Sequence, residues 1–183
     1  MPHRLKHFVT RHEPRSGNTL AHVKSGLGGA IGIGAVGALA VTTHQPFLLA
    51  PFGASAVLLF GHPGSPLAQP ANVVGGYFVA TIVTLLLLML FPGAWVAAAV
   101  GVGIAIALMS MLRITHPPAG AIPILAATST IQGGTLLGVV VGGSIGLVGV
   151  ASLHHWLPPR LEYPKRRPVL EIAKETVEET GSR

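Results

Sequence analysis

The sequence predicts an all-α polytopic membrane protein, with four full transmembrane helices, two short Pro/Gly-interrupted re-entrant segments and an internal two-fold repeat. Three observations predict this class. Half of the 183 residues are hydrophobic and only 10% are charged, whereas about a quarter are charged in ordinary soluble domains. Between Lys24 and Arg160 the only formal charge is that of Arg113. Similar segments also recur at an offset of 67 residues.

Basic residues flank this hydrophobic block on both sides, and the net charge is +6. The positive-inside rule explains such a distribution without nucleic-acid binding. It puts both termini in the cytoplasm and requires an even number of crossings. We therefore expect a basic N-terminal tail (1–24), a transmembrane domain (25–159) and a C-terminal tail (160–183), in the bacterial inner membrane.

The four full spans are expected where apolar stretches approach the roughly 20 residues that cross a bilayer. The first, 25–43, has no evident cleavage motif and is interpreted as an uncleaved helix. A tight turn at Pro92-Gly93 separates the second span from the third. The remaining spans are 73–91, 94–112 and 133–157. Beyond them, residues 168–180 could form a short surface helix.

Two shorter apolar segments, 47–61 and 113–130, are interrupted by proline and glycine. Their length suits re-entrant or broken helices better than complete spans. Six crossings, with both short segments spanning, would satisfy the charge pattern equally well. Paired interrupted segments in two halves indicate a transporter binding site.

The repeat relates residues of about 25–91 to those of about 92–158. At the 67-residue offset, Gly75-Gly76 falls on Gly142-Gly143, and four residues of the first short segment fall on identical residues of the second: Pro51, Gly53, Ala54 and Leu58 on Pro118, Gly120, Ala121 and Leu125. The halves are parallel if the short segments do not cross and inverted if they do, and both alternatives stay open.

Glycines at intervals of four also predict close helix contacts, as at Gly134, Gly138, Gly142 and Gly146. Packing within the chain is the favoured explanation. A homo-oligomer formed through the glycine-rich faces is the other.

The two short segments are the candidate binding site for a small anion. Proline favours the first turn of a helix, and helix N-termini carry partial positive charge and free N–H donors. Arg113 would be balanced by the anion, unless it only marks the end of a span. The candidate substrate-binding residues are Pro51, Phe52, Gly53, Ala54, Ser55, Arg113, His116, Pro117, Pro118, Ala119, Gly120 and Ala121.

Among these residues His116 could relay a proton, because histidine titrates near neutrality; a histidine beside a proline pair more often only caps a helix or bonds a carbonyl. The block has no Cys, Asp or Glu to complete a metal site or a pair of catalytic acids. We therefore expect no metal, no cofactor and no enzymatic activity.

Two motifs resemble the HPP family of integral membrane proteins. They are THPPAGAIPIL at 115–125, and PFGASAVLLFG at 51–61 followed by SPLAQPANVVGG at 65–76. The resemblance covers roughly residues 20–157. It implies four membrane-spanning helices and, from family members in cyanobacteria and plastids, nitrite transport. Some members carry a C-terminal regulatory domain pair; none follows here, so we expect no regulation of that kind.

The residues alone therefore predict transport of a small monovalent anion between two broken-helix N-termini, and the resemblance favours nitrite. A passive anion channel and a non-transporting membrane scaffold or sensor are the alternatives. The expected partners are the inorganic anion, the lipid bilayer and a second copy of the chain, and not nucleic acid.

Overall fold

A computed structural model describes residues 19–92, 95–131 and 133–165, and every regular element within these residues is helical. The predicted spans correspond to helices α2 (Thr19–Thr43), α4 (Pro70–Leu90), α5 (Trp95–Met111) and α7 (Gly133–Trp156). Of these, α2, α4 and α7 are long and apolar enough to cross a membrane, and α5 is shorter, with 17 residues. The predicted surface helix at 168–180 lies outside the described residues.

The ends of these helices agree closely with the apolar stretches, except at the start of α2. This helix begins at Thr19 rather than at residue 25, and so includes Lys24. A helix can continue into the polar interface, where a lysine extends its ammonium group toward water. Hydropathy marks the buried part of a span and not the end of its helix.

The two short segments form broken helices that start at proline. α3 (Ala50–Ala56) continues as the π-helix η1 (Val57–Gly61), and the 3₁₀-helix η3 (Pro117–Ala121) continues as α6 (Ile122–Thr128). Both have proline within their first two positions, where its missing N–H costs nothing. A further 3₁₀ turn, η2 (Pro66–Ala68), leads into α4.

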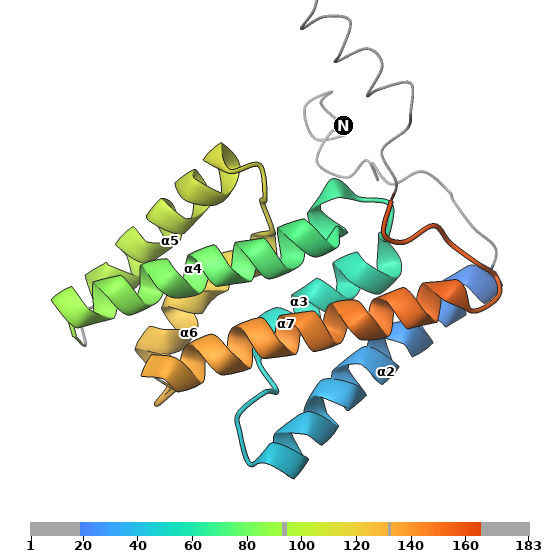
Figure 1. Cartoon of the computed structure of the whole chain (residues 1–183), viewed down its shortest axis with the longest axis horizontal. Helices are drawn as coiled ribbons and strands as arrows, with labels where there is room; N and C mark the ends of the chain where they lie inside the picture. The colour runs from blue at the N-terminus through green and yellow to red at the C-terminus, as the bar shows by residue number, and fades with distance from the viewer. Residues whose placement is uncertain (1–18, 93–94, 132, 166–183) are drawn as a thin grey trace, which may run out of the picture.

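The course of the chain brings the starts of both short helices into the interior (Figure 1). After α2, residues 44–49 rise from the bottom of the view to the middle, where α3 begins and runs to the right. After α5, residues 112–116 likewise return to the middle, where η3 begins and α6 runs to the left. α3 contacts η3 directly, so the two short segments meet near their N-termini and diverge toward opposite ends.

The two halves make matching contacts around this meeting point. α4 packs on α7 in the centre; α2 packs on α7 and η1, as α5 packs on α4 and α6. Each half also has the same element order, a long helix, a short helix that starts at proline, and a second long helix.

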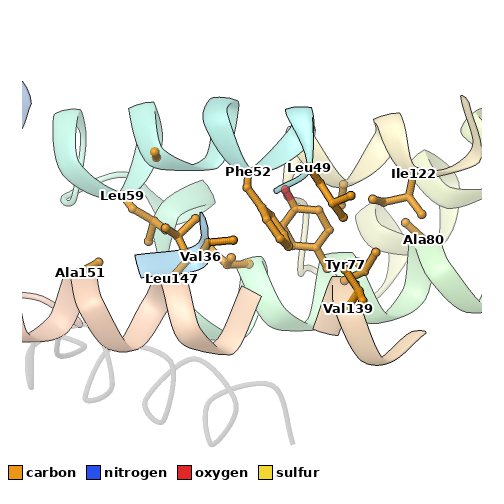
Figure 2. Close-up of a cluster of buried hydrophobic side chains, with 14 of the residues drawn as sticks. Val36, Leu49, Phe52, Leu59, Tyr77, Ala80, Ile122, Val139, Leu147 and Ala151 are labelled. Atoms are coloured by element: carbon orange, nitrogen blue, oxygen red, sulfur yellow. The ribbon is translucent and has the colours of Figure 1, made fainter. Parts of the chain in front are cut away.

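The packed interior contains aromatic and branched side chains from both halves, among them Phe52, Tyr77 and Leu147 (Figure 2). Many large apolar side chains point outward instead: Met89 is 81% exposed and Trp95 78%. A soluble domain would bury many of these, whereas a lipid-facing surface is apolar.

Glycines allow close helix approach at several of these contacts. Most of the glycines that recur at intervals of four in α7 do not serve this purpose. A Cβ at Gly28 or Gly32 would lie within 2.8 Å of the Phe60 ring. By contrast, a Cβ at Gly134, Gly138 or Gly146 would meet nothing within 4 Å. Packing within the described chain therefore does not account for these three glycines.

Candidate functional site

A chain of three buried polar side chains joins the two broken segments in the centre of the molecule. The Ser55 Oγ atom lies 2.7 Å from the Tyr77 hydroxyl and 2.7 Å from His116 Nε2. The other ring nitrogen, His116 Nδ1, lies 2.8 Å from the Leu67 carbonyl oxygen. Ser55, Tyr77 and His116 each have 0% exposure. We call Tyr77, Ser55 and His116 the central hydrogen-bond chain.

The direction of each hydrogen bond follows from the Leu67 carbonyl, which can only accept. Nδ1 of His116 must therefore carry the proton, and in the neutral ring Nε2 is an acceptor. The Ser55 hydroxyl donates to Nε2, so its oxygen is free to accept from the Tyr77 hydroxyl. Every polar atom of the chain thus has a partner while His116 is neutral, as buried polar groups require.

The end of η2 supplies the carbonyl group that accepts the hydrogen bond from His116. η2 ends at Ala68, so its last carbonyls have no partner in a following helical turn. The Leu67 carbonyl accepts from His116 Nδ1, and the Ala68 carbonyl accepts from the Tyr163 hydroxyl at 2.9 Å. Burial raises the pKa of Tyr163, so its hydroxyl remains a donor at neutral pH.

The first turns of α4 hold the segment that carries His116. Asn72 Nδ2 donates to the Thr115 carbonyl at 3.0 Å. A Cβ at Gly76 would lie only 2.8 Å from His116 Cβ and 3.2 Å from the Ile114 carbonyl oxygen. Glycine at 76 is thus required for the close approach that lets His116 reach Ser55, on the other broken segment.

Few backbone donors are free where the two short helices meet. Pro51, Pro117 and Pro118 have no N–H, and the first following amides are used locally: Phe52 N–H bonds the Leu49 carbonyl, and Ala119 N–H the His116 carbonyl. The predicted set of free N–H groups is therefore smaller than the sequence suggested. The donors at this junction are side-chain hydroxyls and the imidazole.

Comparison with known families agrees with the motifs at this junction. A family model described as the HPP transmembrane region matches residues 14–164. The chain belongs to the HPP transmembrane family. In this structure His116 donates from Nδ1 to the Leu67 carbonyl. Pro117 and Pro118 form the start of η3.

Two curated proteins of Dictyostelium discoideum, both described as transmembrane proteins, are similar to this HPP chain. One is 42% identical over 90 residues, 47% of this chain and 29% of its own length. The other is 35% identical over 97 residues, 51% of this chain and 34% of its own length. The match thus covers about a third of each relative. No solved structure matches the chain.

The other predicted site residues of this HPP chain divide between the buried junction and the surface. Pro51, Phe52, Pro118 and Ala119 are buried, and Gly120 and Ala121 are half-buried. Gly53, Ala54 and Pro117 are exposed. A Cβ at Gly53 or Gly120 would meet nothing within 4 Å, so packing does not require glycine at either position.

Arg113 lies at the surface, outside the central hydrogen-bond chain. Its φ is 56°, and the Arg113 and Ile114 amides bond the carbonyls of Ser110 and Met109. This pair of bonds is a Schellman motif that ends α5, with the cation at the favourable end of the helix dipole. The structure thus gives Arg113 a backbone role at the helix end.

This role predicts the effect of two substitutions at position 113. We expect Arg113→Gly to leave the free energy of unfolding unchanged or raise it by up to about 1 kcal/mol, because glycine adopts positive φ without steric cost. Arg113→Val should lower it by more than about 1 kcal/mol, because a β-branched residue fits this conformation badly. Denaturant unfolding in detergent measures both; equal stability of the two variants would contradict the assignment.

Sequence reasoning missed Tyr77, the third member of the central chain. A tyrosine in an apolar helix is a usable signal, because its buried hydroxyl needs a partner. It also missed a second polar layer at the end of η1, where His155 Nε2 lies 2.7 Å from the Leu59 carbonyl oxygen. His155 and its neighbour His154, near the end of α7, are both buried.

A serine hydroxyl 2.7 Å from an imidazole nitrogen is also the geometry of an activated nucleophile. Here the second side of Ser55 Oγ is occupied by the Tyr77 hydroxyl, and Ser55 has no exposed surface. A substrate carbonyl would have to displace Tyr77 to reach it. The arrangement suits reversible exchange of protons and hydrogen bonds better than acyl transfer.

Proposed function

We propose that this HPP protein transports a small monovalent anion across the membrane, with nitrite as the favoured substrate, through the junction between α3 and η3. The observation that carries the proposal is the central hydrogen-bond chain, which links both broken segments inside the buried interior. A fully buried polar chain within membrane-spanning segments indicates a substrate or proton pathway.

The charge distribution supports an anion rather than a cation. No Asp or Glu occurs between Glu13 and Glu162, so the junction offers a cation no carboxylate. The positive ends of two short helices meet there, and helix N-termini stabilise negative charge. The family resemblance, and nothing in the geometry, favours nitrite among small anions.

The direction of the hydrogen bonds in the central hydrogen-bond chain also suggests how the anion is coupled to a proton. In the resting state His116 Nε2 accepts from Ser55 and has no proton to offer an anion. Adding a proton turns Nε2 into a donor and breaks the bond from Ser55, whose hydroxyl is then free. An anion between the two would accept from both, while its charge balances the imidazolium. His116 is therefore proposed as the proton relay. Tyr77 is the titratable group beside it, since the centroids of the Tyr77 and His116 rings lie 5.1 Å apart.

Coupling of this kind removes the work of moving charge across the membrane. One elementary charge costs about 2.3 kcal/mol per 100 mV, whereas an anion that moves with a proton carries no net charge. We therefore propose electroneutral symport. A passive channel, and a scaffold that moves nothing, remain as the alternatives that transport measurements distinguish.

The course of the chain favours six crossings, with the two halves inverted. The short segments leave the middle toward opposite ends of the molecule, as inverted repeats require. The described chain begins and ends on one side, because Lys24 Nζ donates to the Leu157 and Pro159 carbonyls. By the positive-inside rule we propose that this side is cytoplasmic.

Substitutions within the central chain test the transport proposal. In proteoliposomes with an inward proton gradient, Ser55→Ala should reduce nitrite uptake at least about tenfold, equivalent to about 1.4 kcal/mol in the barrier. Tyr77→Phe should reduce uptake less, because it leaves the bond from Ser55 to His116 intact.

Two matched variants are the controls. Ser152→Ala removes a hydroxyl bonded to its own helix, and Tyr163→Phe removes a tyrosine hydroxyl outside the central chain. Both should retain most of the uptake. If the Ser55→Ala protein took up nitrite at the wild-type rate, at normal protein content, this result would show that the anion does not pass Ser55.

A further inference from the structure

A second polar region lies away from the junction, at the end of the molecule where the described chain begins and ends. A cavity of about 480 Å³ opens there between α2, the end of η1 and the end of α7. Its polar side chains are His22, Lys24, Ser25, His154 and His155. None of the lining residues is acidic.

Lys24 provides a positive charge whose partners are neutral. Its Nζ donates to the Leu157 carbonyl at 2.7 Å and to the Pro159 carbonyl at 2.5 Å. An ammonium group has three N–H donors, and carbonyls cancel none of its charge. Within the described residues, one donor and the full charge are therefore left for a further ligand.

His154 and His155 have hydrogen-bonding capacity that the described part of the chain does not use. His154 is 9% exposed and His155 1%, yet among residues 19–92, 95–131 and 133–165 neither His154 Nε2 nor His155 Nδ1 has a hydrogen-bond partner. Because His155 Nε2 donates to the Leu59 carbonyl, Nδ1 of the neutral ring is a bare acceptor. Buried polar atoms without a partner are rare in folded proteins and call for an explanation.

We propose that this cavity is a binding site for a small oxyanion. Lys24 supplies the charge, His154 donates from Nε2, and His155 Nδ1 accepts from a water that the anion retains. The volume leaves room for such waters, since water occupies roughly 30 Å³ per molecule in the liquid. A metal cation would be repelled by Lys24 and would find no carboxylate in the lining.

Binding requires a movement of His154. Its Nε2 faces the backbone of α2, where a Cβ at Gly28 would lie 2.6 Å away. We expect the ring to turn on binding, so that Nε2 leaves this covered position for the cavity. Anion binding should therefore change the environment of the His154 ring, which the ¹⁵N resonances of labelled histidine report.

The binding experiment uses the full chain in uncharged detergent, with gluconate to hold the ionic strength constant. Nitrite, nitrate and inorganic phosphate are titrated while the unfolding temperature is followed, because a ligand that binds the folded state raises it in a saturable way. We expect at least one of the three to do so and to shift the His154 imidazole resonances. Lys24→Met and His154→Leu should each raise the apparent Kd at least tenfold.

Matched variants separate this site from general effects. Lys165→Met removes an exposed lysine elsewhere and should leave the Kd unchanged, and His154→Gln restores a donor near the Nε2 position and should recover part of the affinity. Ser55→Ala interrupts the central chain and should also bind normally, so the two proposals can fail independently. If Lys24→Met does not fold, the wild-type histidine resonances still decide.

The same oxyanion chemistry could come from a lipid phosphate. Nanodiscs of phosphatidylglycerol and of phosphatidylcholine distinguish the two sources. A stabilisation specific to phosphatidylglycerol that Lys24→Met abolishes, without any effect of soluble anions, identifies a headgroup as the occupant. The absence of a saturable effect from the three anions, together with equal stability in both lipids, would overturn the proposal.

Discussion

Replacing His116 by alanine is expected to abolish nitrite uptake and to lower the free energy of unfolding by about 3 kcal/mol or more. The substitution empties a fully buried site and leaves the Leu67 carbonyl and the Ser55 hydroxyl without their partner. Cavities of this size and unpaired buried groups each cost on that scale. Denaturant unfolding in detergent and flux in proteoliposomes measure the two effects separately.

His116→Asn separates the anchoring role of this residue from its proton role. An asparagine amide lies near the position of Nδ1, so the bond to the Leu67 carbonyl can be kept while Nε2 is lost. We expect a smaller loss of stability, about 1–2 kcal/mol, and the same loss of uptake. Exposed His62, changed to Asn, is the control. Uptake that survives in a folded His116→Asn protein would remove the imidazole from the mechanism.

The second large effect is expected at Gly76, which holds the broken segment without contributing a side chain. In Gly76→Ala the new Cβ would lie 2.8 Å from His116 Cβ and 3.2 Å from a backbone oxygen. Overpacking of this kind costs about 1–3 kcal/mol, and relief requires His116 to move away from Ser55. Both stability and uptake should therefore fall.

The neighbouring glycine is a matched control for this prediction. A Cβ at Gly75 would meet only the flexible Ile114 side chain, at 3.1 Å, and alanine is the better helix former. Gly75→Ala should therefore be nearly neutral. At the corresponding positions of the second half, Gly143→Ala would meet the Phe52 ring at 2.5 Å, while Gly142→Ala would meet Phe47 at 3.6 Å. Equal behaviour within either pair would contradict the packing described here.

These two glycine pairs also illustrate what sequence could predict. Hydropathy and charge located the long helices closely, apart from the start of α2, because a bilayer demands an uninterrupted apolar stretch. Proline located the starts of both short helices for an equally local reason. The 67-residue offset paired Gly76 with Gly143, and each contacts the broken segment of the opposite half; the duplication itself remains a prediction.

The hydrogen bonds of the site could not be predicted in the same way. Ser55 and His116 were candidates, but their contact joins residues 61 positions apart, and Tyr77 was not considered. The free N–H groups expected at the helix starts were overestimated, because proline has none and the next amides bond locally. Arg113 was a candidate anion ligand or the end of a span, and its place just after α5 fits the second; only its positive φ is backbone geometry that composition does not encode.

The most direct test of the transport mechanism is nitrite uptake by the wild-type protein in proteoliposomes, first with an imposed proton gradient and then with an imposed voltage. Proton-coupled symport through His116 predicts uptake that follows the inward proton gradient, rises as the outside pH falls and is insensitive to voltage. Uptake driven by voltage alone would contradict it and indicate a channel. No uptake of any small anion under either gradient would exclude transport.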